Sequence, residues 1–367
     1  MYKLFSNKSV FFNFLFLNSF LALFFLLLFQ NSIFAQIGGK TSLEFINLPT
    51  HARVIGLGGA NITSQDAGEQ QDINMHIENP ALLTDATHDR LSLAYYGYSA
   101  GISNVNLAYG HDFKKLGRFS NLAFSFQYLD YGNIESYDAL GNSLGQINAS
   151  EYSFGVSHSQ KFDAFRVGGT LKIAGSQLAG FNATAIYLDL GGTLTHPKKD
   201  LRFGLVMNNL GFLISNYSPT SEYEMPMNIL LGASLKPEKM PVRFSLTLQQ
   251  LFRKNIAYND PARSTTLDAN GQVVVEETSA VDKAFRRIVL GAEIIFSKNF
   301  NIRAGYNFLR RRELVVTARP AFVGFSFGGV LRVRSFEFAY SRSLAHIAGG
   351  TNNFTLTLDT KKLFRKN

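Results

Sequence analysis

The chain has 367 residues and a formal net charge of +9, with 34 Phe, 15 Tyr, no Trp and no Cys. The lack of cysteine excludes disulfides, thiol catalysis and cysteine-based metal sites. Mean hydropathy is close to zero, which argues against a helical membrane protein, because each helical span needs about 20 apolar residues. The basic residues recur in short connections and form no single stripe, so no nucleic-acid partner is expected.

Residues 1–35 have the organisation of a secretory signal peptide. Lys3 and Lys8 give a positive start, an uninterrupted apolar run covers 20–29, and a polar break precedes Ala35. These three parts, in this order, are typical of a segment that is removed after export. We expect cleavage after Ala35. The alternative, a retained helical anchor, would need a longer uninterrupted apolar run.

Residues 36–89 show little apolar periodicity. Gly56, Gly58 and Gly59 cluster in this segment, and Asn79-Pro80 marks a turn. From Arg90 to Thr360, by contrast, apolar and polar residues alternate in one stretch after another. In the stretch LAFSFQY at 122–128, every second residue is large and apolar, and the residues between are small or polar. Successive side chains of a strand point to opposite faces, so this alternation predicts strands with one apolar and one polar side.

We predict fourteen strands from this pattern, and many of them are ten residues long or more. Strands of globular proteins usually have about 5–6 residues, whereas a tilted membrane strand needs about 9–11. An even count also returns the last strand antiparallel to the first and leaves no open edge. The predicted strands are 90–98, 101–111, 119–131, 150–162, 164–175, 183–195, 200–208, 226–236, 241–252, 284–297, 299–309, 320–330, 333–343 and 351–360.

The predicted fold class is therefore all-β, a fourteen-stranded antiparallel transmembrane β-barrel formed by residues 90–367. A soluble antiparallel sandwich would share the alternation, but it would need neither these strand lengths nor a secretory signal. Outer-membrane lipid is then the first expected partner. The segment 36–89 has no face for lipid, where its backbone groups would lack partners. Because fourteen strands enclose a lumen too wide for side chains alone to fill, we predict that this segment is a lumenal plug.

The connections between the strands are of two kinds, which alternate along the chain. One kind is short and rich in Lys and Arg, and the other is mostly long and rich in Asn, Ser, Asp and Gly. Transmembrane barrels have short periplasmic turns and longer outer loops, so we assign the two kinds to opposite sides. The tight turn at Ser99-Ala100 is the exception in length. The short set is 111–118, 161–164, 196–200, 236–241, 297–299 and the turn near Arg332; the long set is 131–149, 175–182, 209–225, 253–283, 309–319 and 344–350.

Two of the long connections carry hairpin signals, DALGN at 138–142 and DANGQ at 268–272. Asn and Gly in sequence favour a tight hairpin, because its turn residues need φ > 0. We predict that both hairpins extend beyond the membrane and offer docking surfaces to a protein partner. The candidate docking residues are Tyr137, Asp138, Leu140 and Asn142 in the first, and Asn270, Gly271, Val273 and Val275 in the second.

The plug segment carries the motifs FINLPTHAR at 45–53, GLGGAN at 56–61, DIN at 72–74 and ENPALL at 78–83. This wording resembles the start of the PorQ proteins, outer-membrane components of the type IX secretion system of Bacteroidetes. The Ala-Arg, Gly-Gly-Ala and Asn-Pro-Ala elements are shared with FadL-like barrels, which have fourteen strands and an N-terminal hatch, and with the related PorV. The resemblance implies a plug motif of Leu48, Pro49, Ala52, Arg53, Gly58, Gly59, Asn79 and Pro80.

No catalytic residue, cofactor or metal site is expected. The strings at 324–328 and 141–145, centred on Ser326 and Ser143, match G-x-S-x-G. A nucleophile elbow needs a strand-to-helix turn, and no helix is predicted after either string. The seven His residues show no metal-binding spacing. Charged residues on the polar faces, such as Asp189, Glu293 and Arg303, are predicted to contact the plug.

The resemblance implies a non-enzymatic function in the outer membrane of a Gram-negative bacterium of the Bacteroidetes. The expected role is to anchor the surface protein PorZ in an attachment complex with the sortase PorU and the shuttle PorV, so that secreted cargo is processed and attached to the cell surface. Two alternatives stay open at this stage. One is a FadL-like transporter of hydrophobic small molecules, and the other is a PorV-like cargo shuttle.

Overall fold

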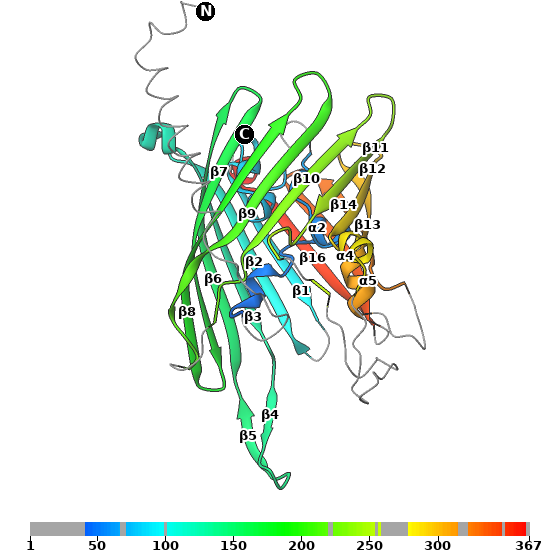
Figure 1. The fold of residues 1–367 in the computed structure, drawn as a ribbon. Coiled ribbons are helices and arrows are strands. Elements are labelled where there is room, and N and C mark those ends of the chain that lie inside the picture. The colour runs from blue at the N-terminus through cyan, green and yellow to red at the C-terminus, as the bar shows by residue number, and fades with distance from the viewer. Residues whose placement is uncertain are drawn as a thin grey trace, which may run out of the picture. The chain divides into compact units, whose positions relative to one another are not determined.

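The computed structural model describes residues 41–66, 71–98, 101–218, 223–253, 256–257, 278–314, 322–346 and 349–364. Fourteen strands close into one barrel (Figure 1), and neighbours along the chain are antiparallel neighbours in the sheet. Strands β4 and β5 form a separate two-stranded sheet between β3 and β6. β1 pairs with β16, from Arg90 opposite Asp359 to Gly97 opposite Asn352, which closes the ring without an open edge.

The predicted fold class is confirmed, and each of the fourteen predicted strands corresponds to one strand of the barrel. Their bounds are β1 Arg90–Gly97, β2 Ser103–Asp112, β3 Asn121–Asp130, β6 Ala149–Phe162, β7 Phe165–Leu178, β8 Phe181–Thr195, β9 Asp200–Ser215, β10 Asn228–Lys236, β11 Val242–Leu248, β12 Ile288–Ile295, β13 Phe300–Asn307, β14 Phe325–Val333, β15 Phe336–His346 and β16 Gly349–Asp359.

The predicted loop at 209–225 is wrong in its first part, because β9 continues to Ser215. Asn209 has φ 63, and its backbone N–H donates to Asp189 Oδ1 over 2.7 Å. The register between β8 and β9 shifts at this point, between Leu188 and Leu190. Asn209, the first residue of the predicted loop, therefore forms a bulge, and the strand resumes beyond it.

Two short helices occupy positions predicted as strand or loop. Helix α4 covers Ala280–Arg286, so β12 begins at Ile288 and not at residue 284, and helix α5 covers Phe308–Leu314 directly after β13. The Ser279 side chain accepts a hydrogen bond from Asp282 N over 3.2 Å, which is an N-terminal cap. A further helix, α6, covers Thr360–Phe364. None of the described helices is long and apolar enough to cross a membrane.

The barrel is apolar outside and polar inside. Along β1, Leu91, Leu93 and Tyr95 are 38%, 46% and 47% exposed, while Ser92 between them is buried. The same order recurs around the ring, where Ser, Thr, Asn and Gln fill the lumenal side and Leu, Phe and Tyr the outer side. Exposing apolar surface to water costs about 25 cal/mol per Å². An apolar band around the whole barrel therefore indicates that lipid surrounds it.

The described part of the N-terminal segment, 41–66 and 71–89, lies in the barrel lumen (Figure 1, blue). It contains five short helices and contacts opposite parts of the barrel wall from within the lumen. Gly168 on β7 leaves room for its backbone, since a Cβ at that position would lie 2.5 Å from the Pro80 carbonyl carbon. Gly305 on β13 leaves the same room for Leu57 and Gly58. The helices are η1 Glu44–Asn47, α2 Ala52–Gly56, α3 Met75–Glu78, η2 Pro80–Leu82 and η3 Asp85–Thr87.

Candidate functional site

A buried network of charges joins the plug to the barrel wall, and Arg53 of α2 is its centre. Arg53 Nη2 lies 2.8 Å from Asp66 Oδ1, and Arg53 Nη1 lies 3.0 Å from Asp66 Oδ2, so the two groups form a bidentate pair. Arg53 Nη2 also donates to Glu293 Oε1 of β12 over 3.0 Å. The Arg53 side chain thus connects helix α2 both to Asp66 of the plug and to strand β12 of the wall.

Three wall arginines complete the network. Arg303 Nε and Arg243 Nη1 donate to the two carboxylate oxygens of Glu293 over 3.0 and 3.1 Å, from the strands on either side of β12. Arg332 Nη2 of β14 lies 2.5 Å from Asp66 Oδ2. Buried charges are tolerated only when they are paired. Four arginines and two shared carboxylates therefore connect β11 to β14 with the plug.

An apolar cluster fills the lumen toward the long-loop end of the barrel. Leu43 and Phe45 of the plug pack there against Leu129 of β3 and Tyr187 of β8, and against the small wall residues Ala174, Ala183 and Ala185. Leu48 is half-buried on the same cluster. Closer to the short turns, Ile73 and Leu83 of the plug pack against Ala108 and Ala123. Apolar packing thus holds the plug on both sides of the charge network.

The other residues of the predicted plug motif also lie in the lumen. Ala52 packs against Val330 and Ala339, and its N–H donates to Thr355 Oγ1 over 3.0 Å. The remaining positions, in order, are a buried proline at the entry to α2, two glycines with positive φ after α2, and a buried Asn-Pro pair at η2: Pro49, Gly58, Gly59, Asn79 and Pro80. Asn79 Nδ2 donates to the Ile62 carbonyl over 2.9 Å, which fastens η2 to the rest of the plug.

The predicted lumenal charges divide into two groups. Glu293 and Arg303 contact the plug residue Arg53 or share its acceptor, as described above. Asp189 instead bonds within the wall, to Lys172 Nζ at 2.6 Å and to the Asn209 backbone. Sequence reasoning missed Asp66, Arg243 and Arg332 as members of the network. The sequence predicts a turn near Arg332. In the structure β14 extends to Val333, and the Arg332 side chain is buried in the lumen.

The hairpin predicted at 138–142 is present and stands apart from the barrel ladder (Figure 1). It consists of β4 Ile134–Tyr137 and β5 Ser143–Ile147. The Asp138 carboxylate accepts hydrogen bonds from Leu140 N over 2.9 Å, Asn142 N over 2.8 Å and Asn142 Nδ2 over 2.9 Å. These bonds, that of the Asn142 side chain above all, hold the pKa of Asp138 below its usual range. The turn is therefore fixed at neutral pH.

Large apolar side chains on this hairpin are exposed. Tyr137 is 56%, Leu140 88% and Leu144 67% exposed. Single exposed apolar residues are ordinary, but several on one projecting ribbon form a patch that a partner could cover. The second set of candidate docking residues, Asn270, Gly271, Val273 and Val275, lies outside the described residues.

The two G-x-S-x-G strings have no catalytic surroundings in the described part of the chain. Ser326 is buried inside β14, and its Oγ donates to the Gly56 carbonyl of the plug over 3.3 Å. Ser143 begins β5, where its Oγ accepts from Gly145 N. Neither serine stands at a strand-to-helix turn. Among the described residues, no group of three His, Asp or Glu side chains is placed to hold a metal ion.

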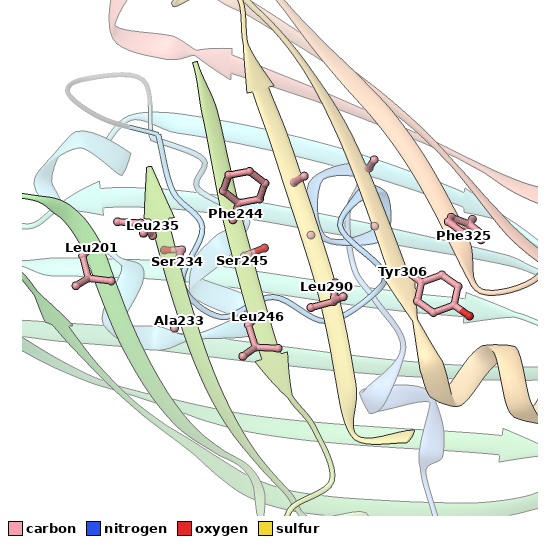
Figure 2. Close-up of a pocket in the computed structure, with 14 residues that line it drawn as sticks. Leu201, Ala233, Ser234, Leu235, Phe244, Ser245, Leu246, Leu290, Tyr306 and Phe325 are labelled. Atoms are coloured by element: carbon pink, nitrogen blue, oxygen red, sulfur yellow. The ribbon is translucent and has the colours of Figure 1, made fainter. Parts of the chain in front are cut away.

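The lipid-facing wall carries an apolar hollow of about 490 Å³ over β10 to β14 (Figure 2). Phe244, Leu290 and Phe325 stand around it, and the two register partners Ala292 and Ala304 form its floor. Large side chains beside two alanines leave a groove on the outer surface. Its lining is suited to the acyl chain of a membrane lipid.

No protein-family model matches the chain, and no curated protein matches it. Solved structures do match. The Ralstonia pickettii toluene transporter TbuX has 12% identity and a TM-score of 0.46, over 85% of this chain and 98% of that one. A Pseudomonas aeruginosa FadL homologue has 12% identity and a TM-score of 0.40, over 85% and 98%. The monoaromatic hydrocarbon channel TodX, as a deltaS2 mutant, has 13% identity and a TM-score of 0.41, over 82% and 97%. At these values, the barrel assignment rests on the strand pairing of this chain itself.

Proposed function

We propose that the protein is a non-enzymatic barrel of the Gram-negative outer membrane that anchors a partner protein at the cell surface through the β4–β5 hairpin. The observation that carries this proposal is the fixed turn at Asp138 beside the exposed side chains of Leu140 and Leu144. A ribbon that is ordered before binding loses less conformational entropy when a partner covers it. An even-stranded antiparallel barrel with an apolar outer band is the outer-membrane type.

The motifs of the plug segment support a more specific assignment. Their resemblance to the PorQ proteins implies a component of the type IX secretion attachment complex, with PorZ as the anchored partner and with PorU and PorV as further members. In this role the protein holds PorZ at the outer membrane while secreted cargo is processed and attached to the surface. The barrel supplies the anchor, and the hairpin supplies the contact.

Transport of hydrophobic small molecules is the second candidate function. The aromatic residues Phe45 and Tyr187 in the lumenal cluster and the apolar hollow in the outer wall favour it. Against it stand the ion pairs of Arg53, because a path through the lumen would require the plug to move and buried pairs to separate. The packing of the plug therefore supports anchoring over transport.

Purification of the tagged protein from native membranes tests the proposal. We expect PorZ to co-purify with the unchanged chain and to be lost with a Leu140→Asp, Leu144→Asp variant. Leu116→Asp is the matched control, because Leu116 is 51% exposed but belongs to η5 (Lys114–Phe119) at the opposite, short-turn end. Retention of PorZ by the hairpin variant would reject the hairpin as the contact.

Deletion of the gene tests the cellular role separately. We expect cargo to be released unprocessed when the anchor is missing. If cargo is still processed and surface-bound, the attachment function is wrong. Uptake of a monoaromatic hydrocarbon into vesicles that contain only this protein would instead support the transporter.

A further inference from the structure

A cleft lies between the plug and the wall opposite the charge network, at the short-turn end of β6 to β9. It has a volume of about 550 Å³, within the usual range for small-ligand pockets. Gln71 and Thr84 of the plug line one side of it. The wall supplies the basic residues Lys161, Arg166 and Arg202 together with the hydroxyls of Thr193 and Thr195.

The strand register places these cations together. Lys161 of β6 and Arg166 of β7 are direct cross-strand partners. Like charges directly opposite one another destabilise an antiparallel pair. Arg202 of β9 is the partner of Thr195 on β8, and Arg166 is the partner of Thr193 on the same strand. Three positive side chains thus line one face across four adjacent strands.

Neither arginine of this cleft forms an ion pair with a described carboxylate. Arg166 Nη1 donates to the Leu83 carbonyl over 3.0 Å and to Ser159 Oγ over 3.2 Å. Arg202 Nη1 donates to the Thr63 carbonyl over 2.9 Å, and its Nε to Thr195 Oγ1 over 3.3 Å. All four acceptors are neutral oxygens, which orient the guanidinium groups without neutralising them.

Few described carboxylates line the cleft. Asp163, on the β6–β7 turn, is the one described carboxylate among the residues that line it. Asp200 lies 3.3 Å from Arg243 and is used there. Asp85 and Asp200 also interact with Arg166 and Arg202 from outside the lining. The excess of positive charge is therefore confined to the described groups that line the space, Lys161, Arg166 and Arg202 against Asp163. Guanidinium groups recognise phosphate through parallel N–H donors, and the threonine hydroxyls add further donors.

We propose that this cleft binds a phosphate-bearing anion at the short-turn mouth of the barrel. The phosphate would lie between Arg166 and Arg202, with Lys161 as a further cation. It belongs either to a small soluble molecule or to the headgroup of a phospholipid. This site is independent of the hairpin and of the anchoring function, so either can fail without the other.

Calorimetric titration of the full chain in detergent with inorganic pyrophosphate tests the site. We expect saturable binding of one pyrophosphate per chain, and at least tenfold weaker binding by the Arg166→Gln, Arg202→Gln variant. Lys198→Gln, Lys199→Gln is the matched control, because it removes two charges from the exposed β8–β9 turn at the same end of the barrel. The control should bind within twofold of the unchanged chain.

A variant with lysine in place of both arginines tests whether weaker binding reflects loss of the guanidinium groups or loss of folding. Arg166→Lys, Arg202→Lys keeps the charge and removes the fork, so we expect intermediate affinity at an unchanged melting temperature. Competition by nanodiscs that contain phosphatidylglycerol, and none by nanodiscs of phosphatidylcholine alone, would assign the phosphate to an anionic lipid headgroup. Absence of competition would assign it to a soluble ligand.

Three results would overturn the proposal. The first is no saturable binding by the unchanged chain. The second is an equal loss of affinity in the Arg166→Gln, Arg202→Gln variant and in the Lys198→Gln, Lys199→Gln control. The third concerns Glu69, which lies in the sequence between Gln65 and Gln71 of the cleft. If pyrophosphate binds only after Glu69→Gln, the cations serve a carboxylate of this chain and not a ligand.

Discussion

The β11–β14 wall and the β6–β9 wall use arginine in opposite ways. On β11 to β14, Arg243, Arg303 and Arg332 each lie within 3.1 Å of a carboxylate oxygen. On β6 to β9, the hydrogen bonds of Arg166 and Arg202 within the described part of the chain go to neutral oxygens, and both residues line an open cleft. The residue type is the same, and the supply of carboxylates differs. The β11–β14 arginines hold the plug through ion pairs, whereas Arg166 and Arg202 contact it through neutral carbonyls and keep their charge available to a ligand.

The largest expected effect is at Glu293, which neutralises the paired wall. Glu293→Gln removes the negative charge that Arg53, Arg243 and Arg303 share and leaves one acceptor oxygen in place of two. Loss of one partner of a buried pair costs about 3–5 kcal/mol. We expect faster hydrogen exchange of residues 41–66, measured by mass spectrometry. Asp163→Asn, in an exposed turn, is the control and should leave exchange of the plug unchanged. Equal protection of the plug in both variants would contradict a holding function of the network.

A steric change on the same side should have a somewhat smaller effect. Gly305→Val places a side chain where the Leu57–Gly58 backbone lies, and forcing extra volume into packed space costs about 1–3 kcal/mol. Gly192→Val is matched to it, because a Cβ at Gly192 meets nothing within 4 Å. Thermal unfolding followed by circular dichroism suits a chain without Trp. A lower melting temperature is expected for Gly305→Val alone.

Removal of Arg166 and Arg202, which have no described carboxylate partner, should destabilise the protein less than the Glu293 change. Arg166→Gln with Arg202→Gln loses hydrogen bonds to neutral acceptors, at about 1 kcal/mol each, and relieves the repulsion between Lys161 and Arg166. The Gln amides can retain part of these bonds, and the relieved repulsion offsets up to about 1 kcal/mol, so the free energy of unfolding in urea should fall by less than about 3 kcal/mol. A loss as large as that of Glu293→Gln would remove the distinction between the two walls.

The smallest effect is expected at the hairpin, which is fastened to neither wall. Asp138→Ala removes the acceptor of the turn, so the amides of residues 138–145 should exchange faster while the barrel melts unchanged. Acid should likewise lower the protection factors of these amides, which are taken relative to the intrinsic exchange rate at each pH. The carboxylate form of Asp138 is favoured in the folded hairpin, so its stabilisation is present at neutral pH and is lost as the pH falls through its lowered pKa. Exchange that is insensitive to both changes would contradict a fixed turn.

The barrel was predictable from the sequence because alternation and strand length are local properties. Each of the fourteen strands could be found from its own residues, and so could the hairpin turn at Asp138. The errors lay where a tertiary contact overrides a local signal. Asn209 looks like a loop residue, but Asp189 holds it in a bulge; the helix cap at Ser279 could not be separated from an ordinary loop serine.

The charge networks were only half predictable. The alternation places Glu293 and Arg303 on the polar face, which identifies them as lumenal. It does not reveal that Asp66 and Arg332, 266 positions apart in the chain, meet in the same network. That neither Arg166 nor Arg202 has a carboxylate partner among the described residues was equally hidden, because it depends on which carboxylates the plug brings to each wall.

The closure between β1 and β16 also constrains how the protein is made. Arg90 is opposite Asp359 in the ladder. The pairing that closes the barrel therefore joins the first and the last strand of the sequence. Contacts of such separation form late, because a long loop must close first. Until then both edge strands are free to pair with other chains. Productive assembly of this protein therefore requires that these two edges stay unpaired with other chains until the last strand arrives.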